Sequence, residues 1–317
     1  MKILLTGSSG WLGRHLAPAL RRAGHEVTGF DRVTGAETHI IGTVADRAAI
    51  DRAVAGHDAV IHTAALHKPD IARYPRVAFV DVNVTGTLNI LEAAVAQGCW
   101  RVVVTSTTSL MIGRTLGQGD TAVWMDESFA PLEPRNIYGQ TKLAAERLCR
   151  LIHDEHGLPV VILRTSRFFP EEDDTHRALS GENMKANELL HRRLTVEDAA
   201  DAHLAALDRA PALGFGTYIV SAPTPFTRDE APKLKTDAAA VIAQHYPHAP
   251  ALYATKGWTL PTSLDRVYDA SLVERALGWR ARTDFAAVLA ALEEGREAPV
   301  AHDAGYVSPG VVKMPCK

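Results

Sequence analysis

The stretch Thr6-Gly7-Ser8-Ser9-Gly10-Trp11-Leu12-Gly13 decides the fold, because it links an apolar run to a helical pattern. Residues 3–6 are predicted to form a strand, and residues 10–23 a helix. The three glycines let the backbone turn tightly, approach a pyrophosphate and pack the helix close to a sheet. The helix N-terminus then offers free N–H groups and a partial positive charge to phosphates. The stretch therefore predicts the phosphate-binding turn of a dinucleotide-binding unit.

The alternation of strand and helix patterns continues through the first half of the chain. Further strands are predicted at residues 26–31, 59–63, 101–106 and 160–163, and further helices at 48–55, 80–97 and 137–156. The run at 101–106 is β-branched and unbroken, as in a strand that is buried on both faces. Strands separated by helices imply an α/β fold, here a doubly wound parallel sheet of Rossmann type.

After Pro170 the pattern loosens. Residues 171–181 are predicted to be a polar loop, and a short strand is predicted at 217–221, among helices at 196–208, 236–245, 270–277 and 284–294. We therefore expect residues 1–170 to form mainly the dinucleotide-binding, Rossmann-type domain. Residues 171–297 are expected to form mainly a smaller substrate lobe, interleaved with the last sheet elements. Gly, Pro and polar residues dominate 298–317, which predicts a poorly ordered or partner-draped tail.

The composition narrows the functional classes. The 317 residues carry a net charge of −3, which gives no basic surface for nucleic acid or an anionic membrane. No run approaches the ~18 apolar residues of a membrane span, and the first residues do not resemble a signal peptide. The cysteines, Cys99, Cys149 and Cys316, lie far apart without a zinc-like or paired spacing. We therefore expect no metal and a reducing, cytoplasmic location.

Asp31 indicates which dinucleotide binds. It closes the second predicted strand, 18 residues after Gly13. A carboxylate at this place accepts hydrogen bonds from the adenosine ribose diol and repels a 2′-phosphate, which favours NAD. Arg32 comes next and could bind that phosphate instead, although a solvated charge is at least as good an interpretation. NAD is therefore the expected cofactor, and NADP stays open as the alternative.

Tyr138-Gly139-Gln140-Thr141-Lys142 supplies a pair of candidate catalytic residues. Tyr138 and Lys142 are four positions apart on one face of a predicted helix. Because helical side chains lean toward the N-terminus, the ammonium of Lys142 can reach back toward the phenol. Its positive charge would lower a phenol pKa of about 10 and favour the phenolate. Downstream of a dinucleotide cradle, the pair predicts a proton-transfer site.

With both motifs, the chain resembles the extended short-chain dehydrogenase/reductase family, which contains NAD-dependent epimerases and dehydratases. The resemblance covers roughly residues 1–295. Further matching stretches are His62-Thr63-Ala64-Ala65, Asn83-Val84-Thr85-Gly86-Thr87, Leu163-Arg164, Val196-Glu197-Asp198-Ala199-Ala200 and Leu277-Gly278-Trp279. Members of this family often pair through two long helices, which correspond to residues 80–97 and 137–156, so the resemblance implies a homodimer.

The resemblance implies a role for each matching residue. Tyr138 would be the acid/base, and Lys142 its activator and a ribose contact. Thr108, five residues before Gly113, would hydrogen-bond the reacting oxygen. The implied cofactor contacts are Gly7, Gly10, Trp11, Leu12, Gly13, Asp31, Arg32, Thr43, Val44, Ala64, Ala65, Tyr138 and Lys142. Thr43 stands where the family usually has an aspartate that meets adenine, with Asp46 three residues on.

Departures from the family pattern narrow the reaction. Where dehydratases carry Asp-Glu, this chain has Ser109 and Leu110, which cannot do carboxylate acid/base work, and a decarboxylase would need Glu at Leu110. Dehydration and decarboxylation are therefore disfavoured, and hydride transfer alone remains. Arg167 replaces a usual asparagine and could clamp a carboxylate or phosphate, or pair with Glu171, Glu172 or Asp173.

The substrate side is less well defined. The interval from Pro170 to Arg193 is short, which predicts a substrate smaller than a nucleoside diphosphate sugar, such as a free or phosphorylated sugar or a sugar acid. His67 and Ser109 are further candidate substrate contacts, although a loop histidine is often merely solvated. The cluster His191-Arg192-Arg193 is expected to lie in solvent rather than to meet an anionic substrate.

Three functional hypotheses follow. The first is an NAD-dependent dehydrogenase or epimerase acting on a sugar or sugar-like molecule. The second is an NADP-dependent carbonyl reductase of small molecules, against which Asp31 argues. The third is a catalytically silent, NAD-sensing regulator, and such proteins commonly lose the Tyr or Lys that is present here.

Overall fold

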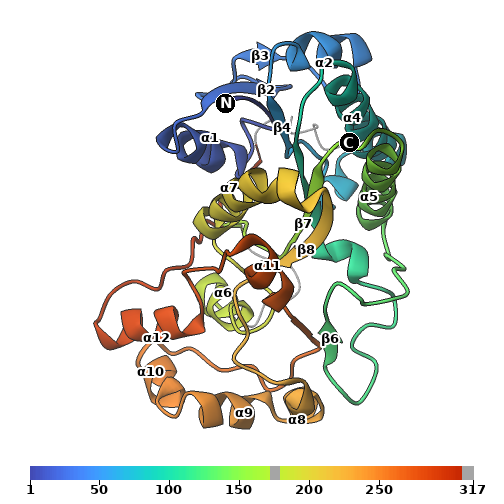
Figure 1. Ribbon diagram of the computed structural model, residues 1–317. Helices are drawn as coiled ribbons and strands as arrows, with labels where there is room; N and C mark the ends of the chain where they lie inside the picture. Colours follow the sequence, from blue (N-terminus) through green and yellow to red (C-terminus); the bar gives the residue numbers. More distant parts are fainter. Residues whose placement is uncertain (172–178, 309–317) are drawn as a thin grey trace, which may run out of the picture.

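Seven parallel strands form the main sheet of the computed structural model, which describes residues 1–171 and 179–308 (Figure 1). Their spatial order is β3-β2-β1-β4-β5-β7-β8. The strands are β1 (Lys2–Thr6), β2 (Glu26–Asp31), β3 (Ile40–Ile41), β4 (Ala59–His62), β5 (Val102–Thr107), β7 (Val160–Thr165) and β8 (Phe215–Val220). The order reverses direction at β1 and β4, which is where open α/β sheets bind ligands.

Helices cover both faces of this sheet. On one face lie α1 (Gly13–Arg22), α7 (Val196–Leu213) and α11 (Ser271–Leu277), and on the other α2 (Arg47–Val54), α4 (Gly86–Ala96) and α5 (Ile137–His156) (Figure 1). A π-helical turn, η2 (Val80–Thr85), precedes α4 and follows the short helix α3 (Arg76–Phe79). The prediction of a doubly wound parallel sheet is confirmed.

The central strands explain why the sheet is stable. Every residue of β7 is buried, and Val103 and Val161 pack against the α1–α7 layer while Val102 and Val160 pack against the α4–α5 layer. Alternate side chains of a strand point to opposite faces, so a continuous apolar run serves both layers. Each such buried side chain contributes about 1.5–3 kcal/mol.

A second hydrophobic core lies beyond one end of the sheet (Figure 1). It collects buried side chains such as Leu189, Tyr253 and Phe285 from several short helices. These helices are α6 (Gly181–Glu188), α8 (Ala231–Thr236), α9 (Ala238–His245), α10 (Ala249–Thr255) and α12 (Phe285–Glu293), beside the two-stranded sheet of β6 (Val123–Met125) and β9 (Arg266–Tyr268). The structure thus adds α3, α6, α8, α10, β3, β6 and β9 to the predicted elements.

One predicted helix starts later than its pattern indicates. The helix predicted at 236–245 is α9, which starts at Ala238, whereas α8 lies before it and ends at Thr236. Asp237 stands between them with an extended φ of −152° and accepts a hydrogen bond from the backbone N–H of Ala240. A short polar side chain that caps the following helix interrupts the preceding one.

The family-like stretch 196–200 serves to hold the fold together. Asp198 is buried on α7, and its two carboxylate oxygens accept hydrogen bonds from the backbone N–H groups of Arg282 and Thr283. These contacts fix the segment that leads into α12. In the described part of the chain, no helix combines the length and the apolar character that crossing a membrane requires.

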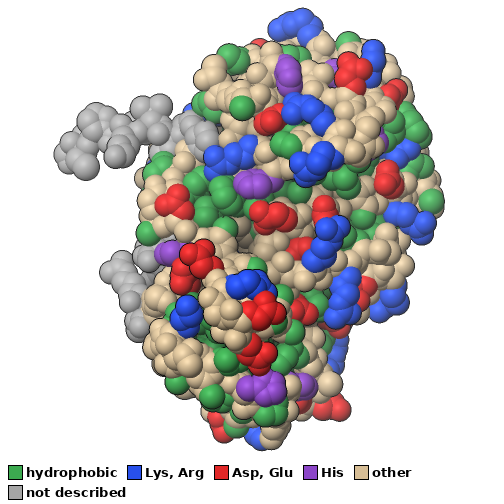
Figure 2. Space-filling view, turned by 90° about the vertical axis from the view of Figure 1, so that its left-hand side faces the viewer, with side chains coloured by type: hydrophobic (Ala, Val, Ile, Leu, Met, Phe, Trp, Pro, Cys, Tyr) green, Lys and Arg blue, Asp and Glu red, His purple; other side chains and the backbone are tan. Residues whose placement is uncertain are grey.

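The segment 301–308 differs from its prediction. It was expected to be poorly ordered or draped over a partner, but it packs against this chain, where Tyr306 meets Trp11 and His302 meets Lys185. Residues 309–317, including Cys316, lie outside the described residues and are drawn in grey in Figure 2, as are residues 172–178.

Candidate active site

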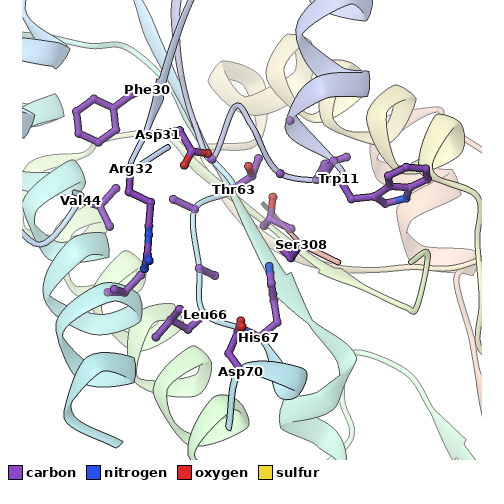
Figure 3. A pocket seen from close by; sticks show the side chains of 18 of the residues that line it. Trp11, Phe30, Asp31, Arg32, Val44, Thr63, Leu66, His67, Asp70 and Ser308 are labelled. Atoms are coloured by element: carbon purple, nitrogen blue, oxygen red, sulfur yellow. The ribbon is translucent and has the colours of Figure 1, made fainter. Parts of the chain in front are cut away.

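The glycine stretch forms one wall of a cleft at the carboxyl ends of β1, β2 and β4 (Figure 3). Gly7 has a φ of +75°, and a Cβ there would lie 2.6 Å from Thr63 Oγ1 and 2.7 Å from the backbone nitrogen of Ala64. A Cβ on Gly13 would overlap the carbonyl oxygen of Gly7. Both positions need glycine. A side chain at Gly7 would push the turn away from β4, and a side chain at Gly13 would push α1 away from the turn.

All predicted cofactor contacts except Tyr138 and Lys142 line this cleft. They are Gly7, Gly10, Trp11, Leu12, Gly13, Asp31, Arg32, Thr43, Val44, Ala64 and Ala65. Thr63, beside Ala64, lines the cleft as well, and so do Tyr74, Phe168, Phe169 and Ser308, which the sequence analysis did not single out. These last four residues come from segments far apart in the sequence, so no local pattern predicts that they lie together.

Asp31 is fixed at the end of β2. One carboxylate oxygen accepts a hydrogen bond from the backbone N–H of Ser9 at 3.0 Å, and the other accepts from Val33 at 3.2 Å. Each oxygen keeps a further lone pair directed at the cleft, where a ribose diol could donate. Arg32 turns away from Asp31, donates to the hydroxyl of Tyr74 at 3.0 Å and lies over the tyrosine ring (Figure 3).

The loop after β3 is built differently from the family pattern. Thr43 and Val44 line the cleft, but Asp46 turns back to cap α2 by accepting a hydrogen bond from the backbone N–H of Ala49. Asp46 therefore does not take the place of the family's aspartate that meets adenine. The glycine cradle, the free N–H groups at the start of α1 and the Asp31 carboxylate together fit a dinucleotide with an unphosphorylated adenosine ribose.

Tyr138 and Lys142 come from the first turns of α5. Asn136 caps this helix by accepting a hydrogen bond from the backbone N–H of Gly139, so the helix starts immediately before Tyr138. Lys142 is buried, and its Nζ donates to the carbonyl oxygen of Thr105 on β5 at 2.6 Å. Both side chains line a second, larger cavity.

The electrostatics of the pair differ from the prediction. Burial raises the pKa of the Tyr138 phenol to about 12, because it penalises the phenolate more than the nearby Thr107 hydroxyl stabilises it. Burial likewise lowers the pKa of Lys142 to about 8. The expected lowering of the phenol pKa is therefore wrong for the chain by itself, since the Lys142 ammonium is directed at the Thr105 carbonyl.

The threonine that contacts the Tyr138 hydroxyl is Thr107. Thr107 forms a side-chain hydrogen bond that favours the Tyr138 phenolate, and it also accepts from the backbone N–H of Ser109. Thr108 lines the same cavity, but its hydroxyl is directed at the carbonyl oxygen of Thr165 at 3.4 Å. Thr107, which the sequence analysis did not single out, is the threonine that faces the phenol, and the contact of Thr108 with a substrate oxygen stays a prediction.

A buried ion pair holds α5 against the sheet. Arg164 on β7 donates to Glu146 at 2.7 Å, and Glu146 also accepts from the hydroxyl of Ser106 on β5. Glu146 lies one turn beyond Lys142, so this network fixes the helix in register with the strand ends. Removing one partner of such a buried pair typically costs about 3–5 kcal/mol.

His67 stands at the junction of the cleft and the cavity. Its ring meets that of Tyr138 edge-on at 5.8 Å and that of Phe169 at 5.4 Å, and burial lowers its pKa. Its loop is anchored by Asn83, whose amide oxygen accepts from the backbone N–H of Leu66 at 2.8 Å. His67 is thus packed beside the phenol rather than solvated.

The cavity next to Tyr138 has a volume of about 1190 Å³. It opens into the cleft, because Thr63, Ala65, His67, Thr105, Phe168 and Phe169 line both. Six cationic side chains line it, Lys68, Arg135, Lys142, Arg167, Arg192 and Arg266, against three acidic ones, Glu171, Glu188 and Asp265. The volume exceeds the roughly 300–1,000 Å³ of ordinary ligand pockets and lends no support to the prediction of a small substrate.

The basic cluster at 191–193 is not in solvent. His191 and Arg193 are buried, and Glu188 pairs with Arg192 at 2.7 Å and with Arg193 at 2.9 Å. The solvent interpretation is wrong, because α6 places Glu188 beside both guanidinium groups. Arg167 does pair with Glu171, at 3.9 Å, and lines the cavity as well, so both of its suggested environments are present. Glu172 and Asp173 lie outside the described residues.

Ser109 and Leu110 occupy the turn where dehydratases carry Asp-Glu. Ser109 lines the cavity, whereas Leu110 is fully buried in a small apolar cluster with Met111 and Tyr268. Neither supplies a carboxyl group to the space beside Tyr138.

Comparison with known proteins identifies the family. The family model described as "NAD dependent epimerase/dehydratase family" matches residues 3–220. The chain belongs to this family. The predicted membership of the extended short-chain dehydrogenase/reductases is confirmed, and so is NAD as the cofactor of the family.

The relatives of this NAD-dependent epimerase/dehydratase family member differ in activity. A 3-beta-hydroxysteroid dehydrogenase of Mycolicibacterium neoaurum is 31% identical over 186 residues, 55% of this chain and 49% of the relative. A dTDP-glucose 4,6-dehydratase of Streptomyces niveus is 31% identical over 191 residues, 54% of this chain and 55% of the relative. The chain spans about half the length of the curated relatives it matches. A dehydratase among them means that the comparisons do not support the exclusion of dehydration.

A solved structure supports the fold over most of the chain. A short-chain dehydrogenase/reductase superfamily protein from Agrobacterium tumefaciens, crystallised with bound NAD, superposes with a TM-score of 0.64. It is 24% identical, and the match covers 93% of this chain and 95% of that one. The likeness includes the second core, beyond the residues that the family model matches.

Proposed function

We propose that this chain catalyses NAD-dependent hydride transfer at a secondary alcohol or carbonyl carbon of an anionic sugar or sugar-like substrate, with Tyr138 as the acid/base. The observation that carries the proposal is the junction of the two hollows. Tyr138 and Lys142 line the large cavity, and each contacts a residue that the cavity shares with the dinucleotide cleft: Tyr138 meets the ring of His67, and Lys142 donates to the carbonyl oxygen of Thr105. A substrate in the cavity would therefore meet the cofactor beside a phenol.

The residues around the phenol would handle the proton. Bound NAD supplies a hydride acceptor or donor and, when oxidised, a positive charge near the site. In the oxidative direction the proton of the substrate hydroxyl passes to Tyr138, and in the reductive direction Tyr138 returns it. Because its pKa is raised to about 12, Tyr138 is a neutral phenol that can donate its proton in the reductive direction. To accept a proton in the oxidative direction it must first lose its own, and the positive charge of bound oxidised NAD would favour that phenolate. Thr107, and Thr108 in the same turn, would hydrogen-bond the reacting oxygen.

Asp31 supports NAD rather than NADP. Its carboxylate is held in place by Ser9 and Val33 and would repel a 2′-phosphate. Arg32 is the only argument for NADP, and its guanidinium is engaged with Tyr74. NADP therefore remains the second candidate, to be separated by measuring the affinity for each dinucleotide.

The cavity lining supports an anionic substrate. Its cationic side chains outnumber the acidic ones, and Arg167 could bind a carboxylate through two parallel N–H groups. We propose a sugar acid or a phosphorylated sugar. The short interval from Pro170 to Arg193 is what argues against a larger substrate, since a cationic cavity of about 1190 Å³ would also hold a nucleoside diphosphate sugar. Titration with UDP separates this class from nucleoside diphosphate sugars: weak or absent binding is expected, and tight UDP binding would contradict the proposed class.

Hydride transfer without dehydration is the expected outcome. The reason is the chemistry of Ser109 and Leu110 alone, since a protonating and a proton-abstracting carboxyl group are both missing from their places. Incubation with NAD and a sugar panel, followed by mass spectrometry, tests it. A product lighter than its substrate by one water would contradict it.

Epimerase and dehydrogenase activity are distinguished by cofactor retention. An epimerase keeps its NAD and shows no net redox change, whereas a dehydrogenase releases NADH. Mass spectrometry of the purified protein for retained NAD, followed by a sugar and sugar-acid panel monitored at NADH absorbance, decides between them. A silent NAD sensor would show neither activity and would keep its biological function after Tyr138→Phe.

We also propose a cytoplasmic homodimer paired through α4 and α5, which lie side by side (Figure 1). Val80, before α4, and Leu151, on α5, are large apolar side chains that are 42% and 47% exposed. Light scattering of the purified protein tests the dimer, and Leu151→Asp should weaken it.

A further inference from the structure

Residues 301–308, which we call the strap, run from the second core to the cofactor cleft. The strap leaves the second core near α12 and passes the loop after β7, where the backbone N–H of Asp303 donates to the carbonyl oxygen of Pro170 at 2.8 Å. It ends at Ser308, which lines the cleft. Figure 3 shows Ser308 amid Trp11, Thr63 and His67, opposite Asp31 and Arg32.

The glycine stretch holds one end of the strap. The ring of Tyr306 meets the indole of Trp11 edge-on at 5.2 Å, and the guanidinium of Arg14 lies 4.5 Å from the centre of the Trp11 ring and 5.4 Å from that of Tyr306. Trp11 is itself tied across the cleft, because its indole N–H donates to the carbonyl oxygen of Phe168 at 3.1 Å. Aromatic and cation–π contacts of this geometry are individually modest but favourable.

The substrate side holds the other end. The Nδ1 atom of His302 lies 2.8 Å from Nζ of Lys185, which is fully buried on α6 and also donates to the carbonyl oxygen of Pro170. The His302 ring lies directly on Gly181, so closely that a Cβ at this position would overlap it. The strap is thus anchored both to the phosphate-binding turn and to the helix that borders the substrate cavity.

We infer that the strap is part of the cofactor site and retains NAD, with Tyr306 and Ser308 as cofactor-retaining residues. A dinucleotide lying along the cleft would have the strap across it, so the strap must lift before the dinucleotide leaves. The rate at which the dinucleotide is released is then its dissociation rate from the open state, multiplied by the fraction of time that the strap is open. This inference rests on the proposed binding of NAD in the cleft.

The contacts of Tyr306 set the expected effect. Tyr306→Ala removes the ring contacts with Trp11 and Arg14 and should raise the open fraction, and with it the NADH release rate, by about tenfold. Tyr306→Phe keeps the ring and should release NADH within about twofold of the unmodified chain. Gly181→Ala displaces His302 without altering any residue of the cleft and should also speed release.

Stopped-flow displacement of NADH by excess NAD, followed by NADH fluorescence, measures these rates on the full chain. Two shortened chains complete the set: one ending at Val300 should release NADH at least as fast as Tyr306→Ala, and one ending at Ser308 should match the full chain. Thermal unfolding of each variant shows that the fold is retained.

The outcomes are distinct. Faster release by Tyr306→Ala, by Gly181→Ala and by the chain ending at Val300 supports the strap. Equal release rates for these variants and the full chain would contradict the strap alone. Tighter NADH binding by the chain ending at Val300 would also overturn it, because the segment would then exclude the cofactor. Absence of NADH binding by the full chain would contradict the proposed function together with the strap.

Discussion

The two hollows of the site are built from different materials. The cofactor cleft is formed by the backbone at strand ends, by glycines and by side chains near them, among them the fixed carboxylate of Asp31. The cavity beside it is lined by side chains from many segments, among them charged ones that pair with one another, such as Glu188 with Arg192 and Arg193. A short stretch of sequence determines the backbone geometry of a turn, so that geometry can be predicted. A network of side chains from distant segments cannot be predicted in this way. The contrast predicts that single substitutions will affect the two hollows differently.

The largest effect is expected at the point where the hollows meet. Tyr138→Phe removes the only acid/base hydroxyl proposed here but keeps the buried ring, so kcat should fall by about 10²–10⁴-fold. The affinity for NADH, measured by fluorescence titration, should stay within about twofold, because the cleft is formed by other residues. Unchanged turnover would show that the proton moves elsewhere.

A matched pair of glycine substitutions tests the backbone character of the cleft. Gly7 and Gly24 both have positive φ, but only Gly7 has neighbours within reach of a Cβ. Gly24→Ala should cost about 1 kcal/mol of unfolding free energy from backbone strain alone. Gly7→Ala should cost several times more and weaken NADH binding by at least about tenfold. Denaturant unfolding and fluorescence titration measure both, and equal losses for the two variants would contradict the close packing of the turn on β4.

Lys142 provides a test of burial at the junction. Its pKa falls from 10.5 in the unfolded chain to about 8 in the folded one, so between these values the unfolded state binds more protons. Stability from this group therefore rises as the pH rises from about 8 to 10.5, by about 3 kcal/mol in total. Lys142→Met removes this contribution, so the difference in unfolding free energy between the two proteins should change with pH across that window. A difference that is constant with pH would show that Lys142 titrates normally.

The smallest effect is expected in the cavity, because several positively charged side chains there can each attract an anionic substrate. Arg167→Gln should raise KM for an anionic substrate by about tenfold and change kcat little, since Arg192 and Arg266 line the same space. Arg280→Gln, which removes an exposed ion pair with Glu274, is the control and should alter neither constant. A neutral sugar should be turned over equally well by the Arg167 variant and the unmodified chain. An unchanged KM for the anionic substrate in Arg167→Gln would show that the cavity does not select charge.

The same contrast explains how far prediction from sequence can go. Gly7, Gly13 and Asp31 act through local geometry, and the stretch that contains the glycines predicted both the sheet and the cleft. Tyr138 and Lys142 were found by helical spacing, but their pKa values depend on burial, which the spacing does not reveal. Thr107 was missed in favour of its neighbour, because the direction of a side chain at a strand end is set by the turn that follows.

The substrate side shows what sequence patterns leave out. Helix α6 carries mostly polar residues and has no apolar stripe, so no periodicity predicts it, although nearly all of it is buried. Its Glu188 pairs with Arg193, 5 residues away, and its Lys185 meets His302, 117 residues away. The sequence likewise predicts a loose tail at the strap, because the contact that anchors the strap is with Trp11, near the other end of the chain.

The central claim is that Tyr138 stands beside the nicotinamide ring, at the opening between cleft and cavity. The most direct test is a crystal structure of this protein with NAD and a substrate analogue bound. Our account predicts the Tyr138 hydroxyl within hydrogen-bonding distance of the analogue's oxygen, with the hydride-carrying carbon of the ring next to it. A nicotinamide that points away from α5, with its ring out of reach of anything held by Tyr138, would contradict the account.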